Sequence, residues 1–132
     1  MSQETVEVVS RALEAYSRRD VDTLRALADP DMVLDWSASR GWLADVYRGI
    51  DESLRFYEGY FEAFDEIEVR PDRFIEAGDS VVVPNVAYQR GRDGIEVSAR
   101  STLMFTIRNR KLIRVCLYQE TEQALRAAGL AG

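Results

Sequence analysis

The chain has 132 residues, of which 46% are hydrophobic, and this size is typical of one domain built around one core. Its net charge of −6 argues against nucleic acid as a partner, and no run of about 18 apolar residues is present to span a membrane. The N-terminus lacks the basic start and apolar stretch of a secretory signal, and the single cysteine, Cys116, cannot form an intrachain disulfide, so we expect a cytoplasmic protein.

The residue types that are missing exclude several kinds of chemistry. There is no histidine, which rules out Ser-His-Asp triads, Cys-His pairs and His-based zinc sites. The only lysine, Lys111, falls in a predicted hairpin turn, whereas a Schiff-base lysine needs a dry pocket. Neither of the glycine-rich phosphate-binding patterns occurs. We therefore expect no metal and no cofactor, and any proton transfer would fall to Asp, Glu or Tyr.

Two helices are predicted at the start of the chain. Residues 3–18 carry apolar side chains at helical spacing, in a stripe that ends at Tyr16. Asp20 is expected to cap a short second helix. The pair Asp29-Pro30 is expected to end that helix, because the residue before a proline avoids the helical conformation.

A third helix is predicted after a strand over residues 32–36 and a loop over 37–48. Asp51 is expected to cap this helix, which covers residues 51–64. Its apolar face is rich in aromatic side chains. That face carries Leu54, Tyr57, Phe61 and Phe64. Such side chains are usually ordinary core, and they can also form the wall of a cavity.

The second half of the chain predicts an antiparallel meander, because its strands are separated by short turns. The expected strands cover residues 67–76, 81–90, 95–108 and 111–119. Pro84, inside the second strand, indicates a sheet edge or a bulge. In the long third strand, Leu103 and Phe105 lie on the face that we expect to point into the core. Met104 lies on the opposite face among polar residues.

Thr121 is expected to cap a last short helix over residues 122–128. The order is then helix, helix, strand, helix and four strands. Helices that are separated in this way from an antiparallel sheet define an α+β domain. The sequence predicts one such domain over residues 1–132, with three N-terminal helices and the sheet around one apolar pocket.

Six segments spread over nearly the whole chain have the order and spacing of a known family. They are VSRALEAYSRRDVD (9–22), LADPDMVL (27–34), VYRGI (46–50), AGDSVVV (77–83), the segment 105–115 and ALRAAGL (124–130). Together they resemble the nuclear transport factor 2-like (NTF2-like) superfamily, in its SnoaL-like branch. The resemblance implies a cone-shaped, curved sheet with a pocket between it and the helices. This fold hosts isomerases, cyclases, hydrolases, dehydratases and binding proteins.

The resemblance also implies a homodimer, often formed through the outer face of the sheet. Two features of the sequence fit this expectation. Met104 interrupts the polar outer face of the long strand, and residues 90–114 hold seven basic and two acidic residues in an otherwise acidic chain. The simpler interpretation of this basic excess is a solvated sheet face.

Asp35 is the main catalytic candidate. In ketosteroid isomerase-like members, an aspartate general base follows a V-x-D pattern, which is here Val33-Leu34-Asp35. The resemblance implies that Asp35 lies in an apolar cavity, where desolvation raises the pKa of a carboxyl group. Tyr57 falls where a supporting tyrosine occurs in those enzymes. The alternative is that Asp35 ends a strand, where it is solvated or caps the following loop.

Other positions depart from the isomerase pattern. The oxyanion-binding tyrosine would align near Ala12 and the assisting acid near Leu103, so steroid isomerisation itself is not expected. In SnoaL-type cyclases a carboxylate late in the sheet acts as acid and base, and Glu120 lies near that region. The side chains expected to line the pocket are Tyr16, Trp36, Trp42, Tyr57, Phe61, Leu103, Phe105, Tyr118 and Glu120.

Two functions stay open at this point. The first is a cofactor-independent isomerase or cyclase, which abstracts a proton from a small apolar ketone or polyketide-like substrate with Asp35 as the base. The second is a non-catalytic small-molecule binding or adaptor domain. The V-x-D pattern favours the first, and the small number of polar candidates favours the second. The two are separated by whether Asp35 points into an apolar cavity beside a tyrosine hydroxyl.

Overall fold

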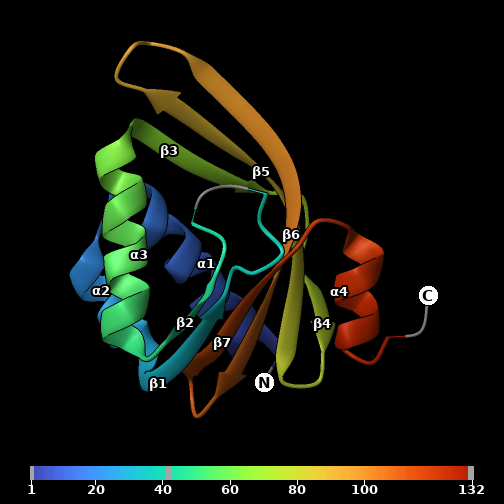
Figure 1. The fold of residues 1–132 in the computed structure, drawn as a ribbon. Helices are drawn as coiled ribbons and strands as arrows, with labels where there is room; N and C mark the ends of the chain where they lie inside the picture. The colour runs from blue at the N-terminus through green and yellow to red at the C-terminus, as the bar shows by residue number, and fades with distance from the viewer. Residues whose placement is uncertain (1, 41–42, 131–132) are drawn as a thin grey trace.

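The computed structural model describes residues 2–40 and 43–130. Within these residues the chain forms four helices and one curved, seven-stranded sheet, as an α+β fold requires (Figure 1). The elements are α1 (Ser2–Arg18), α2 (Val21–Leu27), β1 (Ala28–Asp35), β2 (Val46–Arg48), α3 (Ile50–Ala63), β3 (Phe64–Pro71), β4 (Ile75–Ala77), β5 (Ser80–Gly91), β6 (Glu96–Arg108), β7 (Lys111–Tyr118) and α4 (Thr121–Ala127). None of the described helices has the length and apolar character needed to cross a bilayer.

The sheet has the order β2-β1-β7-β6-β5-β3, with β4 paired to the other end of β5. The meander β5-β6-β7 is antiparallel, as predicted. The sheet as a whole is mixed, because β1 pairs with β7 in parallel. The strand predicted at 67–76 is two strands, β3 and β4, and the predicted loop at 37–48 contains the short strand β2.

Pro84 lies in β5, between the part of β5 that pairs with β4 and the part that pairs with β3. β3 pairs with β5 from Asn85 onward, and β4 pairs with β5 as far as Val82. The backbone N–H of Asp72 donates to the Pro84 carbonyl at 2.8 Å. The missing N–H of the proline therefore faces a local sheet edge, which is where a strand tolerates proline.

The first two helices differ from the prediction at their ends. The Asp20 carboxylate caps α2 as expected, and it accepts the Thr23 N–H at 3.1 Å. The helix ends at Leu27, so Asp29-Pro30 lies inside β1 rather than at the helix end. Strand β1 therefore starts four residues before the predicted strand and ends one residue before Trp36.

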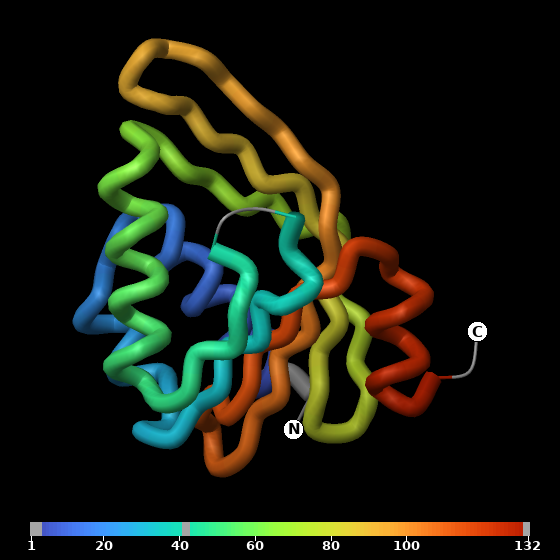
Figure 2. The backbone as a smooth tube through the Cα atoms, in the orientation of Figure 1, coloured from blue at the N-terminus to red at the C-terminus, as the bar shows by residue number. Residues whose placement is uncertain are grey.

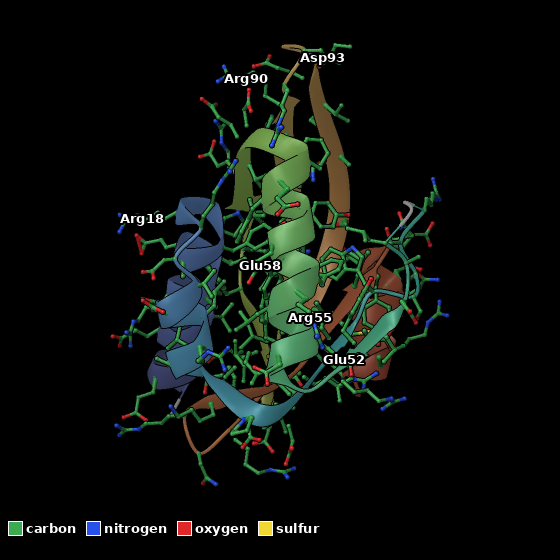
Figure 3. All side chains as sticks on the ribbon, turned by 60° about the vertical axis from the view of Figure 1, so that its left-hand side comes forward. Arg18, Glu52, Arg55, Glu58, Arg90 and Asp93 are labelled. Atoms are coloured by element: carbon green, nitrogen blue, oxygen red, sulfur yellow. The ribbon has the colours of Figure 1, made fainter. Side chains whose placement is uncertain are left out.

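Helix α3 is capped by Gly49, and the prediction of Asp51 as its cap is wrong. Gly49 has a φ of +87°, which favours glycine, and its N–H donates to the Met32 carbonyl at 2.8 Å. The polar side of α3, with Glu52, Arg55 and Glu58, faces away from the sheet (Figure 3). Phe56 is only 3% exposed, although it lay outside the predicted apolar face.

The two faces of the sheet are covered by different helices. Helices α1, α2 and α3 lie on the concave side (Figure 2). Leu103 and Phe105 are buried in the core on this side, as expected. On the convex side, α4 packs over Val82 and Met104 through its buried Ala124. Met104 is therefore covered within the chain, and its place among polar residues no longer indicates a surface for a partner.

Candidate functional site

The candidate site is an apolar cavity of about 90 Å³ between the N-terminal helices and the concave face of the sheet. The helices contribute Leu13, Leu24 and Ile50, and the sheet contributes Met32, Leu103, Phe105 and Val115. The polar groups at its wall belong to Tyr16, Trp36, Tyr57, Tyr60, Asn85, Gln89 and Ser101. Among the described lining residues none is a carboxylate, a lysine or an arginine, so tyrosines are its only titratable groups.

Tyr16 from α1 and Tyr57 from α3 meet at this cavity. Their ring centroids lie 5.3 Å apart in an edge-to-face arrangement, and the Phe61 ring packs 5.6 Å from Tyr16. Neither hydroxyl has a hydrogen-bond partner among the described residues, yet no fully buried side-chain polar atom there is left unpaired. Both side chains line the cavity.

Burial raises the pKa of both tyrosines far above the usual value for a phenol. For Tyr16 the main cause is desolvation, with a smaller effect from the neighbouring Tyr57 and Tyr60. For Tyr57 the cause is desolvation alone. Both phenols therefore stay protonated near neutral pH and act as hydrogen-bond donors.

The sheet side of the cavity carries a second polar group. The Asn85 side chain is 2% exposed, and its Nδ2 donates to the Val83 carbonyl at 2.9 Å. The Ser101 hydroxyl donates to Asn85 Oδ1 across the β5–β6 pair at 3.4 Å. Sequence reasoning missed these two residues. Strand alternation was the available signal, since Asn85 and Gln89 share the inward face of β5 with Val81 and Val83.

The structure brings together five of the predicted pocket residues: Tyr16, Trp36, Tyr57, Leu103 and Phe105. Phe61 lies behind the two tyrosines, against their rings, and is not itself a wall of the cavity. Trp42 lies outside the described residues.

Asp35 does not lie in the cavity, so that prediction is wrong. Its side chain is 19% exposed on the convex side of β1, where Arg114 Nη2 lies 2.9 Å from Oδ2. Its Oδ1 accepts hydrogen bonds from the Ser37 N–H at 3.1 Å and the Ser37 hydroxyl at 2.6 Å. The reason is strand alternation: Met32, Leu34 and Trp36 face inward, so Asp35 must face outward.

The pKa of Asp35 is also shifted in the direction opposite to the prediction. Burial alone would raise this pKa, but the hydrogen bonds from Ser37 and the charge of Arg114 outweigh burial, so the pKa is lowered. A paired carboxylate with a low pKa is a poor proton acceptor. The alternative interpretation, in which Asp35 ends the strand and binds the following loop, describes what the structure shows.

Tyr118 and Glu120 are also absent from the cavity wall. Tyr118 lies on the convex side, where burial and a hydrogen bond with Cys116 raise its pKa to about 12. Burial likewise raises the pKa of the Cys116 thiol. Glu120 is the cap of α4, in place of the predicted Thr121: its carboxylate accepts the Gln123 N–H, and the Gln123 side chain accepts the Glu120 N–H at 3.3 Å. This reciprocal pairing explains its position without an acid-base role.

No cluster of three or more Cys, Asp or Glu side chains in the described part of the chain is placed to hold a metal ion. The chemistry that the cavity offers is therefore hydrogen bonding from neutral phenols and an amide, within an apolar wall. Such a set recognises a polar atom on an otherwise apolar molecule.

Comparison with known proteins agrees with the fold. One similar solved structure is an NTF2-like protein of unknown function from Burkholderia pseudomallei, with 22% identity and a TM-score of 0.77; the match covers 93% of this chain and 95% of that chain. Another is a protein from Jannaschia named for its resemblance to SnoaL-like polyketide cyclases, with 20% identity and a TM-score of 0.76; the match covers 98% of this chain and 94% of that chain. A third is a hypothetical protein of ketosteroid isomerase-like fold from Catenulispora acidiphila, in complex with trimethylamine, with 15% identity, 94% and 93% coverage, and a TM-score of 0.76.

A search of curated proteins finds no match. The family comparison is decisive, because residues 9–115 match the SnoaL-like domain and so cover most of the chain. The chain belongs to the SnoaL-like domain family.

Proposed function

We propose that this protein binds a small, uncharged, mostly apolar molecule that presents a hydrogen-bond acceptor, such as a carbonyl oxygen, to Tyr16 and Tyr57. The observation that carries the proposal is a pair of tyrosines at the wall of the apolar cavity whose hydroxyls have no hydrogen-bond partner among the described residues. A ligand acceptor that pairs with such a donor adds about 0.5–1.5 kcal/mol of net free energy to binding.

The chemistry of the wall supports an uncharged ligand. A charged molecule would lose its hydration on entry and would meet no opposite charge among the described lining residues. The volume of about 90 Å³ far exceeds the roughly 10–15 Å³ needed by one water molecule, and it is small beside the roughly 300–1,000 Å³ of drug-sized pockets. A single-ring compound is the size that we expect.

The same wall disfavours proton abstraction. A general base must accept a proton near neutral pH, and burial raises the pKa values of Tyr16 and Tyr57. Asp35 and Glu120 are held elsewhere by Arg114, Ser37 and Gln123. Binding is therefore the function that this geometry supports best, and the isomerase or cyclase is the alternative that an experiment should test.

The test compares cyclohexanone, cyclohexane and cyclohexanecarboxylate as ligands, with ligand-observed NMR as the readout. We expect the ketone to bind about fivefold to tenfold more tightly than the hydrocarbon, which is the value of about one hydrogen bond, and the carboxylate not to bind. Tyr57→Phe should reduce ketone binding and leave hydrocarbon binding unchanged. Tyr118→Phe, on the convex side, is the matched control and should change neither.

Two results would contradict the proposal. One is tighter binding of the carboxylate than of the ketone. The other is exchange of the α-protons of cyclohexanone in D₂O faster than in buffer alone, because that exchange requires a base at the cavity. Mass spectrometry of the native protein, with any small molecule retained from expression, would identify the natural ligand class directly.

A further inference from the structure

The polar groups at the cavity wall form two sets, one on the helices and one on the sheet. Tyr16 comes from α1 and Tyr57 from α3, whereas Asn85 and Ser101 come from β5 and β6. The three N-terminal helices lie across from these two strands (Figure 1). A ligand in the cavity therefore meets one polar set on the helix side and another on the sheet side.

The strand register puts the two sets at neighbouring levels of the sheet. The Val69 N–H donates to Ser17 Oγ at 3.3 Å, so the end of α1 that carries Tyr16 lies beside β3 at this level. Val69 pairs with the inward-facing residue of β5 that comes directly after Asn85 on the same face, and Asn85 pairs with Ser101. Neighbouring positions on one face of a strand are only about 7 Å apart, a distance that one ring with two substituents can span.

The helix side of the cavity offers donors that lack an acceptor. The hydroxyls of Tyr16 and Tyr57 have no hydrogen-bond partner among the described residues. The indole of Trp36 also lines the cavity, with its ring 5.2 Å from that of Phe56 on α3, and its N–H can only donate. This side therefore favours an acceptor on the ligand, as the proposed function requires.

The sheet side is of the opposite kind, because Asn85 fixes the direction of the hydrogen bonds there. Its Nδ2 donates to the Val83 carbonyl at 2.9 Å, and the reverse orientation of the amide would place two acceptors against each other. Asn85 Oδ1 is thereby left to accept the Ser101 hydroxyl, whose oxygen lies 3.4 Å away. Ser101 lines the cavity and its hydrogen is already donated, so the group that it offers to a ligand is an acceptor.

Gln89, the other amide at the cavity wall, does not change this polarity at Ser101. It lies roughly 13 Å from Asn85 along β5, at the strand rise of about 3.3 Å per residue. It pairs with Val97, whose side chain is 49% exposed, so this part of the wall is near solvent. An amide can donate or accept, but a single ring bound beside Ser101 would not reach this one.

We propose that the ligand is a ring ketone that carries a hydroxyl group across the ring from the carbonyl. The carbonyl oxygen accepts from Tyr16 and Tyr57, and the hydroxyl donates to Ser101 Oγ. Asn85 is a positioning residue, which acts by accepting the Ser101 hydrogen. This inference rests on the proposed function, and it adds the second polar group of the ligand, its place on the ring and its direction of hydrogen bonding.

The first test compares 4-hydroxycyclohexanone with 1,4-cyclohexanedione, two ligands of equal size that differ only across the ring from the shared carbonyl. The hydroxyl can donate, whereas the second carbonyl can only accept and would meet another acceptor at Ser101. We expect ligand-observed NMR to give about fivefold to tenfold tighter binding for the hydroxy ketone, which corresponds to one hydrogen bond. Binding of the dione as tight as that of the hydroxy ketone would overturn the proposal, and this comparison does not depend on any variant folding.

Two substitutions of nearly the same shape test Ser101 itself. Ser101→Thr keeps the hydroxyl, so it should keep the preference for the hydroxy ketone over the dione. Ser101→Val puts a methyl group in place of the hydroxyl, so the ratio of the two dissociation constants should fall to about one. A Ser101→Val protein that retains the full preference would show that another residue makes the second polar contact, and the proposal would be wrong.

Asn85→Leu tests the direction of the hydrogen bond at Ser101. Without the amide oxygen, the Ser101 hydroxyl is free to donate, so binding of the dione should tighten relative to the hydroxy ketone although Ser101 is unchanged. A merely structural role for Asn85 would weaken the binding of both ligands alike. An unchanged ratio in Asn85→Leu would therefore remove its positioning role.

Cyclohexanone, which has no second polar group, separates failure of this inference from failure of the proposed function. If cyclohexanone binds and Tyr57→Phe weakens its binding, but the hydroxy ketone gains nothing over the dione, the inference alone is wrong. If neither cyclohexanone nor the hydroxy ketone binds, the proposed function is wrong and the inference fails with it.

Discussion

Titratable side chains on the concave and convex faces of the sheet have different hydrogen-bond and charge partners. On the concave face, Tyr16 and Tyr57 lie in an apolar wall, their hydroxyls have no hydrogen-bond partner among the described residues, and burial raises the pKa of each. On the convex face, Asp35 is only partly buried, Arg114 and Ser37 contact it, and its pKa is lowered. Burial alone therefore does not set the direction of a pKa shift. The presence of a charged or hydrogen-bonded partner decides it.

The largest effect is expected from the inward side of β6. Leu103→Ala should lower the free energy of unfolding by about 2–5 kcal/mol, because the side chain is 7% exposed and its removal enlarges the cavity. Chemical denaturation measures this change. Val97→Ala is the control on the same strand and the same face, since Val97 is 49% exposed, and it should cost well under about 1 kcal/mol. Equal costs would show that the concave face is not packed as described.

The next effect concerns the partnered acid on the convex face. Asp35→Asn should cost about 1–2 kcal/mol at neutral pH, because it removes the ion pair with Arg114 and weakens the bonds from Ser37. The folded-state pKa lies below the unfolded value of about 3.9, so this stabilisation is present above that value and is lost as the pH falls through the folded-state pKa.

Denaturation of the parent and Asp35→Asn chains at several pH values checks this dependence. The difference in stability between them should shrink in acid. Ligand binding at the cavity should be unchanged, because Asp35 lies on the other face. Loss of ligand binding in Asp35→Asn with normal stability would show that Asp35 contributes to the cavity, and would contradict its assignment to the convex face.

A smaller effect is expected at the cap of α4, which covers the convex face. Glu120→Ala should destabilise the chain by about 0.5–1 kcal/mol, because the Gln123 N–H loses its acceptor. Glu122→Ala, on the exposed side of the same helix, is the control and should change stability less. Thermal unfolding followed by circular dichroism measures both, and a loss of ligand binding in Glu120→Ala alone would revive its proposed role as an acid.

The smallest effect at neutral pH is expected for Tyr57 on the concave face. Tyr57→Phe should change the free energy of unfolding by less than about 0.5 kcal/mol, because its hydroxyl has no hydrogen-bond partner among the described residues. The folded-state pKa is raised, so the parent chain loses stability as the pH rises through the unfolded value of about 10, and the variant should lose less. Denaturation at neutral and alkaline pH measures this, and equal losses in both chains would show that Tyr57 ionises freely.

Much of the fold was predictable from local patterns. Turn spacing and alternation placed β5, β6 and β7 within a residue or two, and they put Leu103 and Phe105 on the inward face. Helical spacing placed Tyr16 and Tyr57 on apolar faces. These features depend on contacts between residues close in sequence, which is why they can be read from the sequence alone.

The position of Asp35 was harder to predict, although the alternation of side chains along β1 indicated that Asp35 and Trp36 point to opposite faces. Trp36 and Asp35 were both expected in the pocket, but adjacent strand residues point to opposite faces. The V-x-D pattern identified the strand and not the direction of its side chains. Only the position of β1 beside β7 decided which face is concave and brought Arg114 next to the carboxylate.

The sequence by itself determined the family, the order of the helices and of the longer strands, and the chemistry that is absent, because these follow from residue types and short-range periodicity. The tertiary structure decided which of the remaining polar groups share a cavity. Tyr16 and Asn85 are far apart in the chain, and only the packing of α1 and α3 onto the curved sheet places them at one apolar wall. The same packing placed Arg114 beside Asp35 and left the hydroxyls of Tyr16 and Tyr57 without partners among the described residues, and this difference is the basis for proposing a binding cavity and not a site with a base.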